Sequence, residues 1–286
     1  MNITDVPQAR GRLSGFFEEI RKLFAFFRRD LLTLWSYRLA FFSDWINLIG
    51  QVLLFTLLSR IVRPEVVPSY GGRQVAYVEF VAVGISVMAF VQVALTRMVT
   101  AIRREQMIGT LEMVLATPTS PTTFQLGSVV FDLIYVPART LLFLGLVSGV
   151  LNIELHPGSW PAALAVLVVF IPFVWGLGEI SAATTLTFRQ GAGFVGLGLS
   201  AMTIFSEGYF PVQVFPTWLQ QIAVWNPLTK AMNGVREALL GGAGFNELLP
   251  TIVYLLPFSA ISLATGSFAF GMALKRERRM GTLGQY

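Results

Sequence analysis

The sequence predicts an all-α, polytopic membrane protein with six transmembrane helices, an N-terminal amphipathic helix and two unusual connections. Hydrophobic residues make up 54% of the 286 residues, charged residues only 13%, and the mean hydropathy is +0.65. A water-soluble globule of this composition would have too little polar surface. Several apolar runs are also long enough to cross the roughly 30 Å hydrocarbon core of a bilayer. The bilayer is therefore the expected solvent.

Residues 1–38 are predicted to lie on the cytoplasmic side and to contain an amphipathic helix. From Leu13 to Leu34, apolar residues recur at three- and four-residue spacing, whereas charged residues, most of them basic, occupy the opposite arc. Phenylalanines on one face and basic side chains on the other are typical of a helix that lies in the headgroup layer. The alternative is an ordinary amphipathic helix packed on protein. The continuation into a spanning segment favours the membrane interface.

Six apolar stretches follow and together define a transmembrane domain over residues 39–274. Their predicted limits are 39–61, 75–99, 124–151, 160–187, 191–210 and 248–274. Lys and Arg are concentrated before the first stretch, between the second and the third, and in the basic tail 275–286. The positive-inside rule therefore places both termini in the cytoplasm.

The cytoplasmic connection over residues 97–123 is longer than a link between two spans requires. Apolar residues within 107–115 predict a short amphipathic helix that needs a partner surface. Pro118 disfavours helical geometry at Thr117, and Pro121 suits the first turn of the next span. A compact helical elbow is thus expected to project into the cytoplasm.

A second unusual connection, residues 211–244, is predicted on the outer side. Prolines, tryptophans and paired glycines interrupt an otherwise apolar segment, which is too broken to span the membrane as one straight helix. Short helices are expected at 219–225 and 228–240, separated by Asn226 and Pro227. This pattern predicts a re-entrant or interfacial hairpin that is buried against the bundle.

A polar stripe marks the first span. Asp44, Asn47 and Gln51 stand at positions i, i+3 and i+7, so their side chains share one helix face. Such a face should contact protein or water rather than lipid. Hydrogen bonding between helices and a role in a transport path are equally good explanations.

Other ionisable residues inside the predicted spans are candidates for function because burying charge in lipid is costly. Glu207, where the fifth span meets the outer hairpin, could be an outer gate residue or could lie in headgroup water. Structural ion pairs with other helices are expected for Asp132 and Arg139, with Glu179 as a candidate partner of Arg139. Glu79 is a further ionisable residue inside a predicted span and is a candidate for the same reason.

Glycines in two spans would permit close helix approach, for which ordinary bundle packing is a sufficient explanation. One set is Gly145 with Gly149, and the other lies within 191–198.

The sequence argues against several other chemistries. The chain has no cysteine and one histidine, His156, which lies in a short polar connection, so neither a metal site nor a catalytic group is expected. None of its three lysines stands in the glycine-rich setting of a phosphate-binding P-loop. No nucleic-acid partner is expected either.

The ordered set of motifs resembles the permeases of the type-2 ABC exporter family over nearly the whole chain. The most specific part is the cytoplasmic elbow, with Arg104, Glu105, Gly109, Thr110, Leu111, Glu112, Thr117 and Pro118. The outer hairpin agrees through Phe210, Pro211, Trp218, Asn226, Pro227 and Arg236. The C-terminal Gly281-Thr282-Leu283 resembles the family's end as well.

The resemblance implies a half-transporter. Two such subunits, identical or different, would form the path through a prokaryotic inner or plasma membrane, with the first and fifth spans at the dimer interface. Separate P-loop ATPase subunits would bind ATP and Mg²⁺, so no cofactor is expected in this chain. The elbow would be the coupling helix that docks on the ATPase, with Glu112 meeting a basic residue there.

Other function classes fit less well. A secondary transporter should have broken helices near the bilayer midplane, and a channel would have no apolar docking helix. An intramembrane enzyme would need a catalytic set, of which the sequence gives no sign. For an exporter, the few intramembrane charges favour a hydrophobic or amphipathic substrate or lipid, with a glycolipid or polysaccharide as the competing class.

Overall fold

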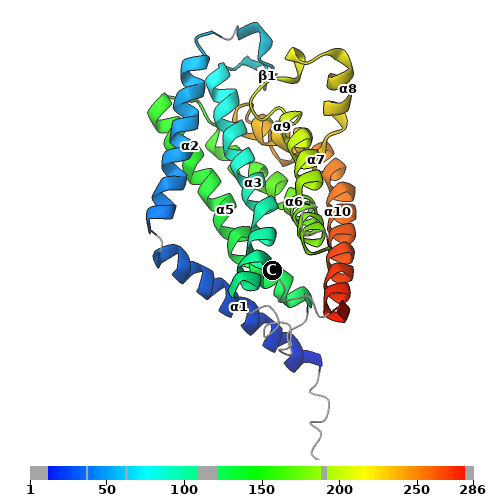
Figure 1. Ribbon diagram of the computed structural model, residues 1–286. Coiled ribbons are helices and arrows are strands. Elements are labelled where there is room, and N and C mark those ends of the chain that lie inside the picture. The colour runs from blue at the N-terminus through cyan, green and yellow to red at the C-terminus, as the bar shows by residue number, and fades with distance from the viewer. Residues whose placement is uncertain (1–11, 37, 62–63, 109–120, 188–191, 281–286) are drawn as a thin grey trace, which may run out of the picture.

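The computed structural model describes residues 12–36, 38–61, 64–108, 121–187 and 192–280, and these residues are nearly all helical (Figure 1). The one sheet among them is a small antiparallel hairpin of β1 (Ser69–Tyr70) and β2 (Arg73–Gln74). Gly71 and Gly72 form its turn with φ of +58° and +75°, a backbone region that glycine adopts without strain. The all-α prediction therefore holds except for this short outer element.

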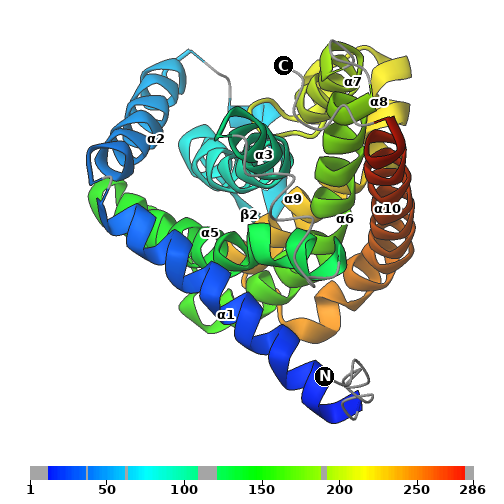
Figure 2. The same cartoon turned by 60° about the horizontal axis from the view of Figure 1, so that its bottom comes forward.

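Helix α1 (Arg12–Ser36) lies across one end of the molecule, at an angle to the upright helices (Figures 1 and 2). It packs on α5 (Pro121–Leu151), where the rings of Phe27 and Phe131 have centroids 5.6 Å apart. Gly127 of α5 leaves room for the ring of Phe26. Other large apolar side chains of α1 are exposed, among them Ile20, Phe24, Leu32 and Trp35. This exposed face is compatible with the predicted interfacial position.

The upright helices follow the predicted spans in order. They are α2 (Arg38–Leu58), α3 (Tyr77–Ile108), α5, α6 (Trp160–Thr187), α7 (Ala192–Ile204) and α10 (Phe245–Met280). Three described segments are long and apolar enough to cross a bilayer, namely 130–151, 157–187 and 245–277, and the apolar parts of α2 and α3 are shorter. The chain is thus a helical membrane protein with several apolar helices.

Helix α7 is shorter than the predicted fifth span, 191–210. Its 13 residues extend about 20 Å at 1.5 Å per residue, less than the thickness of the hydrocarbon core. The chain turns after Ile204, and Glu207 takes a positive φ of 62°, which ends helical geometry there. The prediction carried the span on to Phe210, although Ser206, Glu207 and Gly208 interrupt its apolar run and gave a local signal for an earlier end.

The outer hairpin contains two short helices, as the sequence predicts. They are α8 (Thr217–Trp225) and α9 (Pro227–Leu239), and they lie at the end of the bundle opposite to α1 (Figure 1). Asn226 separates them, and its side chain accepts a 3.0 Å hydrogen bond from the backbone N–H of Leu228. Pro227, which lacks an N–H, occupies the first helical position. A cap followed by proline thus explains why α9 begins where it does.

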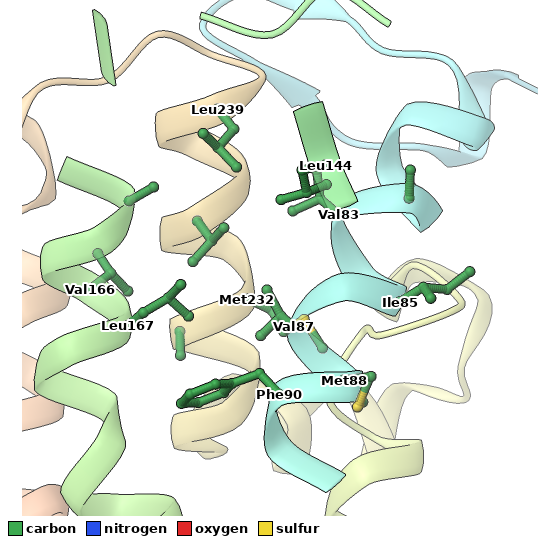
Figure 3. Close-up of a cluster of buried hydrophobic side chains, with 14 of the residues drawn as sticks. Val83, Ile85, Val87, Met88, Phe90, Leu144, Val166, Leu167, Met232 and Leu239 are labelled. Carbon is green, nitrogen blue, oxygen red and sulfur yellow. The ribbon is translucent and has the colours of Figure 1, made fainter. Parts of the chain in front are cut away.

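The core of the bundle forms around α9 rather than around spanning helices alone. Figure 3 shows Val83, Val87 and Phe90 of α3 with side chains of α5, α6 and α9. The α9 residues Met232 and Leu239 are fully buried in this cluster. The hairpin is therefore anchored in the bundle by its second helix, while α8 keeps large exposed side chains such as Trp218 and Ile222.

Close helix approach occurs at other glycines than the sequence suggested. A Cβ atom on Gly176 of α6 would overlap the backbone of Ser262 in α10, and one on Gly266 would overlap the backbone of Gly176. By contrast, a Cβ on Gly149 or Gly196 would have nothing within 4 Å. Spacing along one helix cannot reveal which neighbour approaches it, so the closest pair, α6 with α10, was missed.

Candidate functional site

A cavity of about 310 Å³, here called the central cavity, lies between α2, α3, α5 and α7. Its polar lining comprises Asn47, Gln51, Gln92, Arg139 and Thr203. Apolar side chains, such as those of Ile85 and Met88, complete the wall. Polar side chains in the wall of a mainly apolar cavity need an explanation, because polar groups in lipid are costly unless they serve packing or transport.

The predicted stripe of the first span contributes two residues to this cavity. Gln51 donates a 2.9 Å hydrogen bond from its side-chain amide to Oδ1 of Asn47. Both residues line the central cavity. Asp44 lies on α2, but its side chain is outside the part of the chain that the structure describes.

A second cavity of about 260 Å³, here called the inner cavity, adjoins the first between α3, α6 and α7. The two cavities share Gln92 and Thr203. The inner cavity adds hydroxyl groups from Thr96, Thr100, Ser181, Thr185 and Ser200. Along α3 its lining residues come after those of the central cavity, and thus nearer to the end of the bundle where α1 lies (Figure 1). The two cavities together form a row of polar groups along one side of α3, and all of these groups except Arg139 are uncharged.

Tyr209 connects the central cavity with the outer hairpin. It lines the cavity, its ring stacks on Phe55 with a centroid distance of 5.3 Å, and its backbone carbonyl accepts a 3.0 Å hydrogen bond from the hydroxyl of Tyr77. The neighbouring Phe210 contacts the same Phe55 ring edge to face at 6.4 Å. Tyr209 therefore places the central cavity next to a cluster of aromatic side chains.

Arg236 of α9 organises the outer hairpin. Its side chain is fully buried and donates hydrogen bonds to the backbone carbonyls of Glu207, at 2.7 Å, and Phe80, at 3.2 Å. The guanidinium carbon lies 3.5 Å from the centroid of the Phe80 ring, a cation–π contact. Burial lowers the pKa of Arg236, an effect that Tyr70 and Glu207 oppose. The residue therefore links α3, the turn after α7 and α9.

Glu207 is part of the same network. It is 3% exposed, its Oε1 accepts a 3.1 Å hydrogen bond from the N–H of Val212, and its Oε2 accepts a 2.6 Å bond from the side-chain amide of Asn233. The hydroxyl of Tyr70 donates to Oδ1 of Asn233 at 3.1 Å, and burial raises the pKa of Tyr70 to about 12. Of the two positions considered from the sequence, headgroup water does not fit this buried carboxylate.

The other hairpin residues divide into buried anchors and exposed aromatics. Asn226 is buried and donates a 2.9 Å hydrogen bond to the carbonyl of Met202 at the end of α7. Pro211 and Pro227 are buried as well. Phe210 and Trp218, in contrast, are 48% and 62% exposed, which suits contact with the outer membrane interface.

A third cavity, of about 740 Å³, lies on the outer side of this network. Its charged lining consists of Glu207, Lys230, Glu237 and Glu247. His156 lies near its edge, where a Cβ on Gly242 would meet the imidazole ring. Within the described residues, no cluster of histidine and acidic side chains could hold a metal ion.

The candidate ion pair between Arg139 and Glu179 is not the arrangement observed. Glu179 lies in the tight contact between α6 and α10, where its Oε2 accepts a 2.7 Å hydrogen bond from the hydroxyl of Ser267. Arg139 instead lines the central cavity. Glu79 lies at the outer start of α3 and pairs with Arg73 at 3.3 Å. The spacing along each helix could not indicate which neighbour its charged face meets.

Comparison with known proteins decides the family. The family model described as ABC-2 type transporter matches residues 21–240, which include most of α1, the two adjoining cavities along α3, and both α8 and α9. The chain belongs to the ABC-2 type transporter family. It is an ABC transporter permease, and its predicted resemblance to that family is confirmed.

Two relatives of this ABC-2 family member are named as resistance permeases. The linearmycin resistance permease protein LnrN of Bacillus subtilis is 36% identical over 107 residues, which span 37% of this chain and only 28% of LnrN. A probable doxorubicin resistance ABC transporter permease protein, DrrC, of Mycobacterium tuberculosis is 23% identical over 248 residues. That match covers 82% of this chain and 84% of DrrC.

Most of the predicted coupling residues of this ABC-2 permease lie outside the described residues. These are Gly109, Thr110, Leu111, Glu112, Thr117 and Pro118. Arg104 and Glu105 fall in the last turns of α3, and their side chains are not described. The assignment of a coupling helix to this segment therefore stays a prediction.

Sequence reasoning missed several residues that the structure brings to these sites. Gln92 and Thr203, shared by both cavities, are uncharged, and only charged residues and the α2 stripe were considered. A single amide in the apolar span 75–99 was the available signal for Gln92. Asn233, three residues before Arg236 and thus on the same helix face, was the signal for the outer network.

Proposed function

We propose that this ABC-2 permease forms the membrane path of an ATP-driven exporter and moves hydrophobic or amphipathic molecules. The observation that carries the proposal is the pair of adjoining cavities along α3, which bring amide and hydroxyl groups of four helices together inside an apolar bundle. Packing alone would be served by apolar side chains at less cost. A row of weak polar sites lets a substrate enter and leave.

The lining supports an amphipathic substrate. Most of the central cavity's side chains are apolar, and its polar groups lie among them, so a molecule with both kinds of surface would find complementary contacts. The resistance permeases LnrN and DrrC are named for linearmycin and doxorubicin, which favours a drug-like molecule. A lipid remains within the same class, and a glycolipid or polysaccharide is the alternative substrate.

We place six spans in the membrane, with both termini in the cytoplasm. In this topology α7 and the turn that follows it form the fifth crossing, and α8 with α9 form a re-entrant outer hairpin between the fifth and sixth. Residues 39–274 are then the transmembrane domain, residues 1–38 carry the interfacial helix and residues 275–286 form the cytoplasmic tail. The location of α1 and the end of α10 at one end of the bundle supports this arrangement (Figure 1).

The outer hairpin would close the path. Tyr209 ends the central cavity, and its neighbours in the turn are held through Glu207 by Arg236. Outward opening would require this turn to move with α9, a rigid-body change of the kind that gates other transporters. Glu207 would act in this gate as a positioning residue.

A second permease subunit would complete the path at α2. The α2 face that points away from α3 exposes large apolar side chains, namely Phe42, Ile46, Ile49, Leu53 and Leu57. We propose that this face contacts the second permease subunit, with lipid on the remainder. The same chain or a related permease could be that subunit.

ATP would act through separate P-loop ATPase subunits that bind ATP and Mg²⁺. The elbow at residues 97–123 is the proposed docking element, and Glu112 the proposed contact to a basic residue of the ATPase. A secondary transporter or a channel that needs no ATPase is the alternative function.

Co-purification separates these functions. A tagged chain, extracted in a stabilising detergent, should bring down a P-loop ATPase in a fixed ratio, and the complex should hydrolyse ATP. Repeated recovery of the permease without an ATPase, together with transport driven by an ion gradient, would favour the secondary transporter instead.

A further inference from the structure

We propose that the third cavity, here called the outer cavity, binds a zwitterionic molecule whose ammonium group meets Glu237 and whose anionic group meets Lys230. The cavity has a volume of about 740 Å³, which suits a small ligand. Among the described residues, it shares none of its lining with the central or the inner cavity. Such a site would be separate from the proposed transport path.

Three carboxylates line the outer cavity, and the fold already uses two of them. Glu207 accepts two hydrogen bonds from the outer hairpin, and Glu247 accepts one, of 3.0 Å, from the backbone N–H of Gly244. The Glu237 carboxylate receives no hydrogen bond and forms no ion pair within the part of the chain that the structure describes. Partial burial raises the pKa of Glu237, because the carboxylate loses water without gaining a donor. Glu237 is thus the carboxylate that a ligand cation can meet.

Lys230 is the only cation among the described lining residues of the outer cavity. No described carboxylate forms an ion pair with it, and its amino group lies 5.7 Å from the centroid of the Tyr254 ring. An ammonium group has three N–H donors, and a cation–π contact does not use them all. Lys230 can therefore donate to an anionic group of a ligand.

The two charged groups line one cavity but do not pair with each other. Lys230 and Glu237 are seven residues apart on α9, so they share one helix face and stand roughly 10 Å apart along its axis. Asn233 lies between them on this face and is held by hydrogen bonds to Glu207 and Tyr70. A ligand with two opposite charges could therefore bridge the two side chains across a neutral middle.

A ligand with a single charge would fit this cavity less well. A cation alone would satisfy Glu237 but would bring its charge near Lys230, and an anion alone would meet Lys230 in a cavity with three carboxylates. A zwitterion gains a charge-assisted hydrogen bond at each end and is neutral as a whole. Val212 and Val224 offer apolar contacts for the methylene groups between its charges.

The test measures the binding of probes of matched length to the full permease chain in dodecyl maltoside, a non-ionic detergent. The zwitterion ε-aminohexanoate carries both charges, whereas hexylamine and hexanoate carry one each. Calorimetric titration should show that the zwitterion binds at least about tenfold more tightly than either of them. Its binding should also raise the thermal unfolding midpoint. The zwitterion glycine, whose charges are too close together to reach both side chains, should bind as weakly as the singly charged probes.

Variants assign each end of the probe to one side chain. Glu237→Gln should weaken the binding of ε-aminohexanoate to the level of hexanoate, and Lys230→Gln should weaken it to the level of hexylamine. The exchange Lys230→Glu with Glu237→Lys should restore binding, because the probe can turn round. Lys275→Gln, at an exposed position near the other end of α10, is the control and should bind like the parent. Equal affinities for the zwitterion and the singly charged probes, or undiminished binding in Glu237→Gln, would overturn the proposal.

Nanodiscs distinguish two sources of such a ligand. The head group of phosphatidylethanolamine has an ammonium and a phosphate, whereas that of phosphatidylglycerol has no cation. Weaker binding of ε-aminohexanoate in phosphatidylethanolamine nanodiscs than in phosphatidylglycerol nanodiscs would indicate competition by a lipid head group. Equal binding would indicate a soluble zwitterion, and both outcomes support the site. Because this binding needs no ATP, a failure of ATP-driven export would refute the proposed function alone.

Discussion

Arg236 donates a 2.7 Å hydrogen bond from Nη2 to the backbone carbonyl of Glu207, and this bond ties α9 to the turn that ends the fifth predicted span. The same turn approaches α3 so closely that a Cβ on Gly84 would overlap the carbonyl of Gly208. Three segments far apart in the sequence thus meet at one buried guanidinium. The outer end of the bundle should behave as one unit for this reason.

Loss of this guanidinium should destabilise the permease. Arg236→Met removes the donors to the carbonyls of Glu207 and Phe80 and leaves both acceptors buried, at an expected cost of about 2–4 kcal/mol in the free energy of unfolding. Arg236→Lys should be intermediate, because the charge stays but the fork is lost. The thermal unfolding midpoint of the purified protein in detergent measures the effect.

The matched control is Lys230→Met on the same helix, whose amino group lies 5.7 Å from the ring centroid of Tyr254. Its midpoint should stay close to that of the parent. Similar midpoints for Arg236→Met and Lys230→Met would show that the Arg236 network does not stabilise the hairpin.

Tyr70 predicts a loss of stability in strong alkali. Burial raises its pKa from the ordinary value of 10.0 to about 12, so the folded state holds the proton more tightly than the unfolded state. Its contribution to stability is complete below about pH 10 and is lost as the pH rises toward about 12, by roughly 2–3 kcal/mol in all. Unfolding midpoints from pH 8 to 12 should fall more steeply for the parent than for Tyr70→Phe, in which the phenol does not ionise. Parallel curves would contradict the raised pKa.

Because α6 and α10 are in close contact, we expect alanine substitutions at two glycines to change the stability by very different amounts. Gly176→Ala puts a methyl group against the backbone of Ser262 and should cost about 1–3 kcal/mol of stability. Gly271→Ala, on α10 with nothing within 4 Å of the added methyl group, should be neutral or slightly stabilising. Thermal midpoints of the two variants test the pair, and a cost at Gly271 equal to that at Gly176 would argue against the close approach.

Because Gln92 lies in the wall that the two cavities share, we expect its substitution to reduce transport without impairing folding. Gln92→Leu removes an amide that lines both cavities, so export should fall at least about threefold, the effect of one lost hydrogen bond, while the unfolding midpoint changes little. Gln221→Leu, at an exposed position of α8, is the control and should export normally. Normal export by Gln92→Leu would show that the two cavities are not part of the transport path.

Composition and apolar run length were sufficient to predict the helical membrane fold, because each helix must satisfy its own backbone and present apolar side chains. Asn226 and Pro227 fixed the start of α9 for a local reason, a cap and a proline. The turn after Ile204 is also bonded by Arg236, which lies much later in the chain, so the local sequence around Glu207 carried only part of the information.

The candidate site, too, contains some residues that could be predicted from a single helix and others that could not. Asn47 and Gln51 could be found from spacing on one helix, since i and i+4 positions always share a face. The convergence of Gln92, Arg139 and Thr203 requires the packing of three further helices, and no single helix carries that information.

ATP-dependent accumulation of substrate in inverted vesicles that contain the permease and its ATPase is the most direct measurement of the proposed coupling. We expect accumulation that requires ATP hydrolysis, and we expect Glu112→Arg to abolish it while the protein stays inserted and folded. Accumulation driven by an ion gradient without ATP would contradict the proposed coupling. Unchanged export and unchanged substrate-stimulated ATP hydrolysis in Glu112→Arg would contradict it as well.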